Sequence, residues 1–229
     1  MTSRQFLAAA VVAAGVFAAG TASAGTNLLV NGDFNAGNVG FSADYTLTTM
    51  TPQLFQNGVH GIYAIERPSD IPGSAAYGDW TNAKTDPLGG NSPVYVADGD
   101  DTSLDITWEE TVTVQPHTLY KFSYYGIEVS NDCCSNAELQ PWIGSSAGPT
   151  LTVNGGWQQS SMLWASNSNT SVTLLIFNNN FSGPFNDFAM DDLSFKALSV
   201  PEPSTWAVML LGVGLAGAAL RRRRSAITA

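Results

Sequence analysis

Basic residues are scarce in this chain of 229 residues, where nine Lys and Arg stand against nineteen Asp and Glu. Five of the nine lie near the chain ends, at Arg4 and at Arg221 to Arg224. Residues 25–198 therefore carry four basic and eighteen acidic side chains, a net charge of −14. Such a surface repels phosphate backbones, so nucleic acid is not an expected partner. It suits divalent cations and neutral ligands, or it serves only to keep the protein soluble outside a cell.

Cysteine and histidine are also rare. The two cysteines, Cys133 and Cys134, are adjacent in a polar stretch typical of turns. A disulfide between neighbours closes a strained and easily reduced ring, so three states stay open: that disulfide, two free thiols, or pairing with another chain. With only His60 and His117 in addition, a zinc site is not expected. The chain also lacks the usual hydrolase, metalloprotease and phosphate-binding motifs, so we expect no catalytic residues.

Long apolar runs are absent, but each end carries a short one. Phe6 to Ala19 follows a basic N-terminus and precedes the small-residue site Ala22-Ser23-Ala24, which predicts a signal peptide over residues 1–24, cut after Ala24. Trp206 to Leu220 is uncharged and would form roughly 22 Å of helix, short of a bilayer core of about 30 Å. The four arginines that follow would hold the C-terminus on the cytoplasmic side.

Residues 199–229 resemble the PEP-CTERM sorting signal of Gram-negative bacteria, on the basis of Pro201-Glu202-Pro203, the apolar stretch and the arginine cluster. The resemblance implies transient anchoring in the inner membrane and processing by an exosortase near Pro201, Glu202 and Pro203, in organisms that make exopolysaccharide. A simple tail anchor is the alternative. If both terminal segments are targeting signals, the functional part of the chain is a single domain over residues 25–198. That length is enough for a substantial hydrophobic core.

No sustained helical period occurs between residues 25 and 198, and strand patterns take its place. Leu104 to Val114 alternates apolar and polar positions except at Glu110, and Leu119 to Val129 follows a Pro-His turn. We expect these two runs to form an antiparallel hairpin. Shorter strands are expected at Leu28 to Val30, His60 to Ile65, Val94 to Ala97, Thr150 to Val153, Gln158 to Trp164, Ser171 to Phe177 and Phe188 to Phe195. Many short strands separated by turns predict an all-β sandwich or jelly roll.

Glu110 is the exception to the alternation, because its register points it toward the core, where an unpaired carboxylate is costly. We expect either a β-bulge at Glu109-Glu110 or a buried glutamate held by hydrogen bonds. A catalytic acid is the third reading. Glycoside hydrolysis needs a second carboxylate about 5 to 10 Å away, and Glu109 points to the opposite face.

Three segments resemble galactose-binding-like jelly rolls, particularly secreted carbohydrate-binding modules. Asn27 to Asn35 resembles their opening strand and loop, Asp187 to Phe195 their last strand, and Trp108 to Tyr124 their central hairpin. Glu110 stands where the family usually has Gln, and Asn35 where Glu commonly follows Phe. The resemblance implies a jelly-roll β-sandwich.

The same resemblance implies a structural calcium ion where the first loop and the last strand lie side by side. The matching oxygen donors are Asp33, Asn35 and Asp192, with Asn31 and Asp191 as nearby alternatives. Calcium takes six to eight oxygens, so backbone or water would complete the shell. Strand alternation sends Asp191 and Asp192 to opposite faces. The alternative is that the loop is only a turn and the acids only line a strand edge.

Tryptophan supplies the candidate binding surface. Trp80, Trp142 and Trp157 lie near predicted loop ends, the last two beside amide side chains, where a flat ring can stack on a sugar and amides can bind its hydroxyls. Packing in the core is the alternative for each. We expect an exported cell-surface or matrix protein that binds carbohydrate or exopolysaccharide without catalysis. A structural biofilm protein without specific sugar binding and a glycan hydrolase are the alternatives.

Overall fold

The computed structural model describes residues 25–49, 60–71, 84–100, 104–129, 136–181, 186–198 and 209–218. The chain divides into a compact unit, Ala24–Leu198, and a second unit formed by Met1–Ser23 and Ser199–Ala229. All described core residues lie within the first unit, so it carries the core it needs to fold by itself. Several predicted features lie outside the described residues, namely the signal peptide with Ala24, Trp80, Cys133, Cys134 and the motif Pro201, Glu202 and Pro203.

Two sheets make up the first unit. One has the order β1-β2-β3-β11-β5-β9, and the other has the order β4-β10-β6-β7, with β8 paired to β6. All pairs are antiparallel except β1 with β2. The first sheet comprises β1 (Thr46–Leu47), β2 (Ile62–Glu66), β3 (Val94–Asp98), β11 (Phe188–Ala197), β5 (Leu119–Glu128) and β9 (Gln158–Ala165). The second comprises β4 (Ile106–Thr113), β10 (Ser171–Asn178), β6 (Glu138–Ile143), β7 (Ser146–Ala147) and β8 (Leu151–Thr152).

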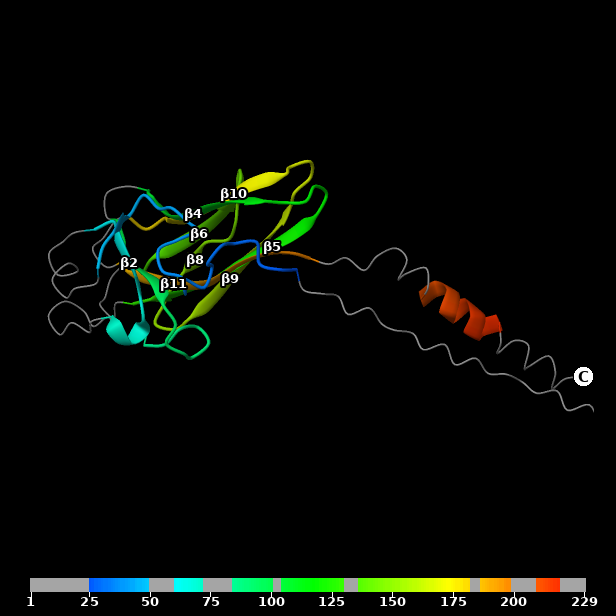
Figure 1. Cartoon of the computed structure of the whole chain (residues 1–229), viewed down its shortest axis with the longest axis horizontal. Helices are drawn as coiled ribbons and strands as arrows, with labels where there is room; N and C mark the ends of the chain where they lie inside the picture. The colour runs from blue at the N-terminus through cyan, green and yellow to red at the C-terminus, as the bar shows by residue number, and fades with distance from the viewer. Residues whose placement is uncertain are drawn as a thin grey trace, which may run out of the picture. The chain divides into compact units, whose positions relative to one another are not determined.

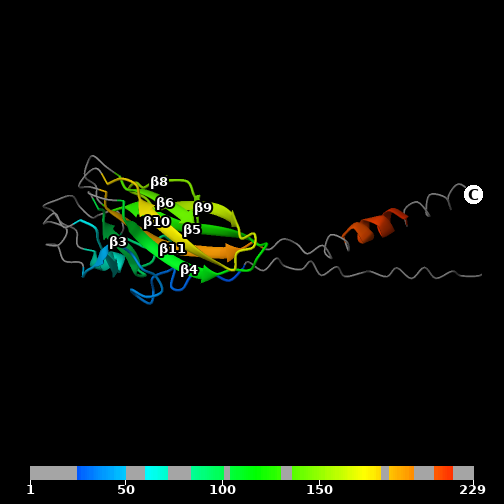
Figure 2. The ribbon, with the colours of Figure 1, turned by 90° about the horizontal axis from the view of Figure 1, so that it is seen from above.

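The sheets form two layers, with β4, β6 and β10 above β5, β9 and β11 in Figure 1, and Figure 2 gives the view from above. Their inner faces are apolar because alternate residues of each strand point inward. Buried tyrosines join the layers: Tyr124 Oη donates to the Leu139 carbonyl at 3.0 Å, and Tyr95 Oη donates to the Thr107 carbonyl at 2.7 Å. This architecture confirms the predicted all-β jelly-roll sandwich.

The predicted hairpin of Leu104 to Val114 with Leu119 to Val129 is wrong. β4 pairs with β10, whereas β5 pairs with β11 and β9 in the other sheet. The turn between β4 and β5 therefore crosses from one layer to the other, and the Trp108 and Phe122 rings stack across the interior with centroids 6.2 Å apart. The alternation of apolar and polar residues shows which face of a strand is buried. Because strands of both sheets bury one face, the alternation does not indicate which strand pairs with which.

Glu110 points inward as its register predicts, and it is held by a hydrogen bond rather than displaced by a bulge. The pairing of β4 with β10 is regular from Trp108 to Thr113, and the irregularity falls between Ile176 and Phe177. Glu110 is 7% exposed, and its Oε1 accepts a hydrogen bond from the Val30 amide at 2.7 Å. Burial raises the pKa of this carboxyl, and the Val30 N–H partly offsets the rise.

A second apolar cluster covers the outer face of the larger sheet. Val94 and Val96 of β3 lie there with Ile127 of β5 and Ala189 of β11, and Trp157 packs against them. A short 3₁₀ helix, η1 (Pro68–Asp70), follows β2. Ile71, which directly follows η1, belongs to the same cluster, so this segment covers part of the outer face.

Both ends of the first unit leave at one end of the sandwich. A Cβ atom on Gly25 would come within 2.7 Å of the Ala197 carbonyl oxygen, and the Leu198 amide donates to the Leu119 carbonyl at 2.8 Å. In the second unit, residues 209–218 form a helix. Its apolar side chains are mostly exposed, and Leu210, for example, is 70% exposed. Among the described residues, no helix has the length and apolar character needed to span a membrane.

Candidate functional site

The outer face of the smaller sheet carries an apolar strip that the core does not use. Along β10, Val172, Leu174 and Ile176 point inward and are buried, whereas Leu175 and Phe177 point outward and are half-buried. Single exposed apolar residues are ordinary on a protein surface, but neighbouring ones on an open sheet face form a surface that can bind a partner.

Strand register brings a predicted residue into this strip. Trp142 of β6 is directly opposite Leu175 of β10. Its ring meets the Phe177 ring edge to face, with centroids 6.4 Å apart and planes at 81°. Trp142 is half-buried, so part of the indole remains open to solvent beside two other apolar side chains. We call Trp142, Leu175 and Phe177 the apolar strip.

Amide groups border the apolar strip on one side. Gln140, opposite Phe177 in the register, donates from Nε2 to the Gly148 carbonyl at 3.2 Å and accepts at Oε1 from Asn179 Nδ2 at 3.0 Å. Each side-chain amide has two donor hydrogens and an acceptor oxygen, so both keep capacity for a ligand after these bonds. The hydrogen bond between the two amides holds both side chains in place before a ligand binds.

On the other side, Glu109 of β4 lies opposite Leu175, and hydroxyl groups follow along the two strands. Thr111 of β4 and Thr173 of β10 face each other, with their Oγ1 atoms 2.7 Å apart. Both also line a cavity of about 360 Å³ at the end of this sheet, together with Ser145, Asn169 and Ser171. The apolar strip is thus continued by a hollow that offers four hydroxyl groups beside the apolar side chains of Ile143, Trp164 and Val172.

The structure separates the predicted tryptophans. Trp142 lies on the smaller sheet, within β6, whereas Trp157 packs on the outer face of the larger sheet. The Trp157 indole Nε1 donates to the Thr85 carbonyl at 2.8 Å, which ties the ring to a covering loop. These two rings therefore do not form one platform. The structure adds Leu175 and Phe177, which the alternation of β10 alone could not assign to a site.

The first loop lies beside the last strand, as the resemblance implied. Asn27 connects them, because its Nδ2 donates to the Leu193 carbonyl at 2.9 Å and its Oδ1 accepts from the Phe195 amide at 2.8 Å. The Leu193 amide also donates to the Gly32 carbonyl at 2.8 Å. Leu28 to Val30, predicted as a strand, belongs to neither sheet and instead contacts β11 through the bond from the Leu28 amide to the Phe195 carbonyl.

Two of the three predicted calcium ligands line one cavity. Asp33 and Asp192 border a space of about 460 Å³, together with Asn31. Asn35 does not line it, and its Nδ2 instead donates to Asp33 Oδ2 at 2.9 Å. Asp192 lies in the irregular part of β11 with a positive φ of 52°, a conformation that departs from the expected strict alternation with Asp191.

Four acidic side chains influence one another around this cavity. Burial raises the pKa of Asp191 to about 8, and the charges of Asp192, Asp86 and Asp33 add to the rise, against one backbone hydrogen bond. Burial would raise the pKa of Asp86 too, but backbone amides from Ser92, Gly90 and Leu88 outweigh it and hold that pKa below its usual value. No sequence signal pointed to Asp86, because it lies in a loop far from both matched segments.

The acids around this cavity do not by themselves form a complete metal shell. Within the described part of the chain, no group of three or more His, Cys, Asp or Glu side chains has an arrangement that could hold a metal ion. Asp33 and Asp192 can supply two oxygens, and Asn31 adds a neutral amide. A calcium ion here would therefore need backbone carbonyls and water for most of its shell.

Comparison with known proteins gives different matches for the C-terminal tail and for the sandwich. Residues 199–224 match the family model described as PEP-CTERM protein-sorting motif. This motif implies recognition by an exosortase-type sorting enzyme and indicates an exported protein. Comparison with curated proteins gave no match.

Solved structures are similar to the sandwich. They include the Stig cyclase Fisc from Fischerella sp. TAU, with a TM-score of 0.53 and 10% identity over 78% of this chain and 100% of that one. The CBM22-1 xylan-binding domain of Xyn10C from Paenibacillus barcinonensis has a TM-score of 0.46 and 12% identity, covering 78% of this chain and 98% of its own. Family 16 Carbohydrate Binding Module-2 has a TM-score of 0.43 and 13% identity, covering 74% and 99%.

At sequence identities of 10 to 13%, the similarity to these structures concerns the fold alone. The chain thus carries a PEP-CTERM protein-sorting motif at residues 199–224, which follows in sequence a jelly-roll domain similar in fold to the Stig cyclase Fisc.

Proposed function

We propose that this exported protein binds carbohydrate without catalysis, through the apolar strip on the outer face of the smaller sheet. The observation that carries the proposal is the half-buried Trp142 ring, which lies opposite Leu175 and edge to face with Phe177. An aromatic ring of this kind can cover the apolar face of a sugar ring. Binding sites commonly combine such a surface with a few fixed polar groups.

The bordering polar groups support a sugar rather than an apolar ligand. The amides of Gln140 and Asn179 and the hydroxyls of Thr111 and Thr173 offer donors and acceptors for sugar hydroxyls. The net charge of −14 over residues 25–198 favours a neutral polysaccharide over an anionic one. Extracellular polysaccharide is therefore the proposed ligand class.

Retention on immobilised or gel-embedded polysaccharides tests this proposal. Residues 24–198 should be retained by at least one neutral glycan of an array, and Trp142→Ala should weaken retention about tenfold, as loss of roughly 1.4 kcal/mol of ring contact would. Leu163→Ala is the matched control, because Leu163 is 59% exposed on β9 of the other sheet. Retention that survives Trp142→Ala and Phe177→Ala would contradict the assignment.

Further outcomes of the same experiment separate the alternatives. Weakening by Trp157→Ala or Trp80→Ala, but not by Trp142→Ala, would move the site to the other predicted tryptophans. Absence of retention on every glycan would favour a structural biofilm or matrix protein. Release of reducing sugar from polysaccharide would indicate a glycan hydrolase and contradict the non-catalytic role.

We also propose a structural calcium ion between the first loop and β11, held by Asp33 and Asp192, with Asn35 positioning Asp33. The shared cavity of Asp33 and Asp192 supports it. After the larger effect of burial, the charges of Asp86 and Asp33 raise the pKa of Asp192, and Lys196, which lines the same cavity, offsets only part of the rise. A divalent cation would relieve that repulsion.

The final location follows from two proposed cuts. Removal of the signal peptide after Ala24, and exosortase processing near Pro201, Glu202 and Pro203, would release the sandwich from transient anchoring in the inner membrane to the cell surface or the medium.

A further inference from the structure

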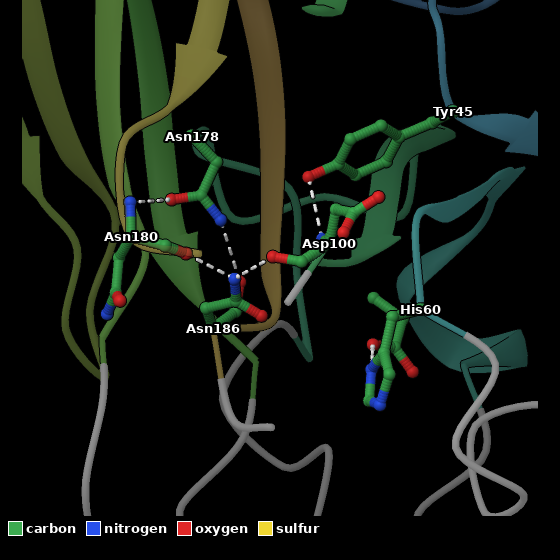
Figure 3. A network of polar contacts seen from close by, with 7 residues as sticks. Tyr45, His60, Asp100, Asn178, Asn180 and Asn186 are labelled. Carbon is green, nitrogen blue, oxygen red and sulfur yellow. Dashed lines mark hydrogen bonds and ion pairs between the residues drawn. The ribbon is translucent and has the colours of Figure 1, made fainter. Parts of the chain in front are cut away.

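A second polar cluster lies at the end of the sandwich opposite to Gly25 and Leu198. Asp98 is the last residue of β3, and Asn186 and Asp187 immediately precede β11, whose other end leads to Leu198. His60 precedes β2 on the same side. Figure 3 shows His60, Asp100 and Asn186 gathered there. None of these residues belongs to the apolar strip or to the first-loop cavity.

Two carboxyl groups of this cluster are in direct contact. Asp187 is almost wholly buried, forms a side-chain hydrogen bond with Asp98 and accepts another from the Gly99 amide. Burial, and then the charge of Asp98, raise the pKa of Asp187 far above its usual value. Asp98 is itself 4% exposed, and its Oδ1 lies 3.0 Å from His60 Nδ1. Two buried acids are thus placed against one imidazole.

Two oxygen atoms in this cluster have no hydrogen-bond partner. Asp187 Oδ1 and Asn186 Oδ1 are both fully buried and unpaired. A buried polar atom without a partner costs free energy, so each requires an explanation such as an ion or a water molecule. Neither belongs to a strand ladder, because both residues precede the first residue of β11.

The orientation of the Asn186 amide is fixed. Its Nδ2 donates to the Asp100 carbonyl at 2.9 Å and to the Asn180 carbonyl. Exchange of the nitrogen and oxygen would place an oxygen against two carbonyl oxygens, so the unpaired atom must be the oxygen. Figure 3 shows the nitrogen between these carbonyls. A Cβ atom on Gly99 would lie only 2.3 Å from Asn186 Oδ1, so this oxygen needs glycine beside it.

We propose that Asp98, Asp187 and Asn186 bind a hard divalent cation, of the calcium class, at this end of the sandwich. Carboxylate and amide oxygens are the donors that calcium prefers. The described residues hold no cluster of three acidic, histidine or cysteine ligands. The proposed set therefore depends on the neutral Asn186 oxygen in addition to the two carboxylates. Backbone carbonyls and water complete the shell, and His60 orients Asp98 from outside it.

A cation here joins the end of β3 to the start of β11. These strands pair directly from Phe188 with Ala97 to Met190 with Tyr95. Asp98 and Asp187 follow and precede those pairs, so the ion extends the ladder where backbone pairing stops.

Thermal unfolding with added calcium chloride tests the site. The protein used is residues 24–198 with Asp33→Asn and Asp192→Asn, so that the proposed first-loop calcium site cannot contribute. At calcium one hundredfold above the dissociation constant, we expect the unfolding midpoint to rise by about 5 to 10 °C. Asp187→Asn should abolish this rise. Asp70→Asn, a matched change at an exposed acid in η1, should leave it intact.

The competing state is a proton shared between Asp187 and Asp98. In that state calcium does not move the midpoint, and Asp187→Asn keeps the hydrogen bond through its amide, so the variant unfolds at the same temperature with or without calcium. Absence of a calcium-dependent rise in the parent protein, or a rise that survives Asp187→Asn, overturns the proposal. If Asp187→Asn does not fold, Asp98→Asn serves in its place, and the parent titration still decides.

Discussion

At the scale of single residues, Glu110 sets a pH dependence of stability. Burial raises its pKa above the ordinary 4.5, so the folded state binds this proton more tightly than the unfolded chain does. Its contribution is fully present below pH 4.5 and is lost as the pH rises through the raised pKa. Glu110→Gln keeps the acceptor for Val30 and cannot ionise, so we expect the variant to lose less stability than the wild type as the pH rises from 4.5 to 7.

Urea unfolding of the wild type and the variant at several pH values measures this effect. Glu109→Gln is the matched control, because the Glu109 side chain lies outside the core, where its Oε1 accepts from Ser42 Oγ at 2.8 Å. An identical pH profile for wild type and Glu110→Gln would show that the buried carboxylate costs nothing. Glu110→Ala, which removes the acceptor for the Val30 amide, should instead destabilise by about 1 to 2 kcal/mol.

At the scale of elements, the first loop and β11 should bind calcium as one unit. Calorimetric titration of chelator-treated residues 24–198 should show one calcium site that is lost in the Asp33→Asn, Asp192→Asn double variant and kept in Asp70→Asn, in addition to the proposed site at Asp98 and Asp187, which the double variant retains. Asn35→Ala should have a smaller effect, because Asn35 reaches the cavity only through Asp33. If the double variant binds calcium as the wild type does, this set is not the site.

Strand boundaries could be predicted where alternation is long and unbroken. Leu119 to Val129 and Ser171 to Phe177 match β5 and β10 to within a residue. β6 was missed because Pro141 interrupts it, and proline is unusual inside a strand. Pairing could not be predicted, since the choice between sheets depends on contacts between residues far apart in the sequence, such as the ring contact of Trp108 with Phe122.

The candidate site was only partly predictable for the same reason. Trp142 stood out as a tryptophan beside an amide, but its companions Leu175 and Phe177 are recognisable only once β10 is paired with β6. One signal existed: residues 174–177 are apolar without interruption, which means that the outer face of β10 is apolar as well. The cluster at Asp98 and Asp187 had no such signal, because 88 intervening residues separate its two acids.

At the scale of the whole molecule, both ends of the chain should be removed. Mass spectrometry of the protein from cells with an active sorting system should find Gly25 at the N-terminus and a C-terminus near Pro201, Glu202 and Pro203. Cells without the exosortase are the control and should retain the tail. A C-terminus still at Ala229 in sorting-competent cells would contradict processing and favour a simple tail anchor.

Before that processing, the sandwich is attached through Leu198, directly after β11. β11 lies between β3 and β5 and is hydrogen-bonded to both. Ladder hydrogen bonds run across the strands, so a pull along β11 loads many of them together in shear instead of opening them one at a time. A sandwich that holds polysaccharide while still attached to its membrane would therefore transmit mechanical force through one of its best-supported strands.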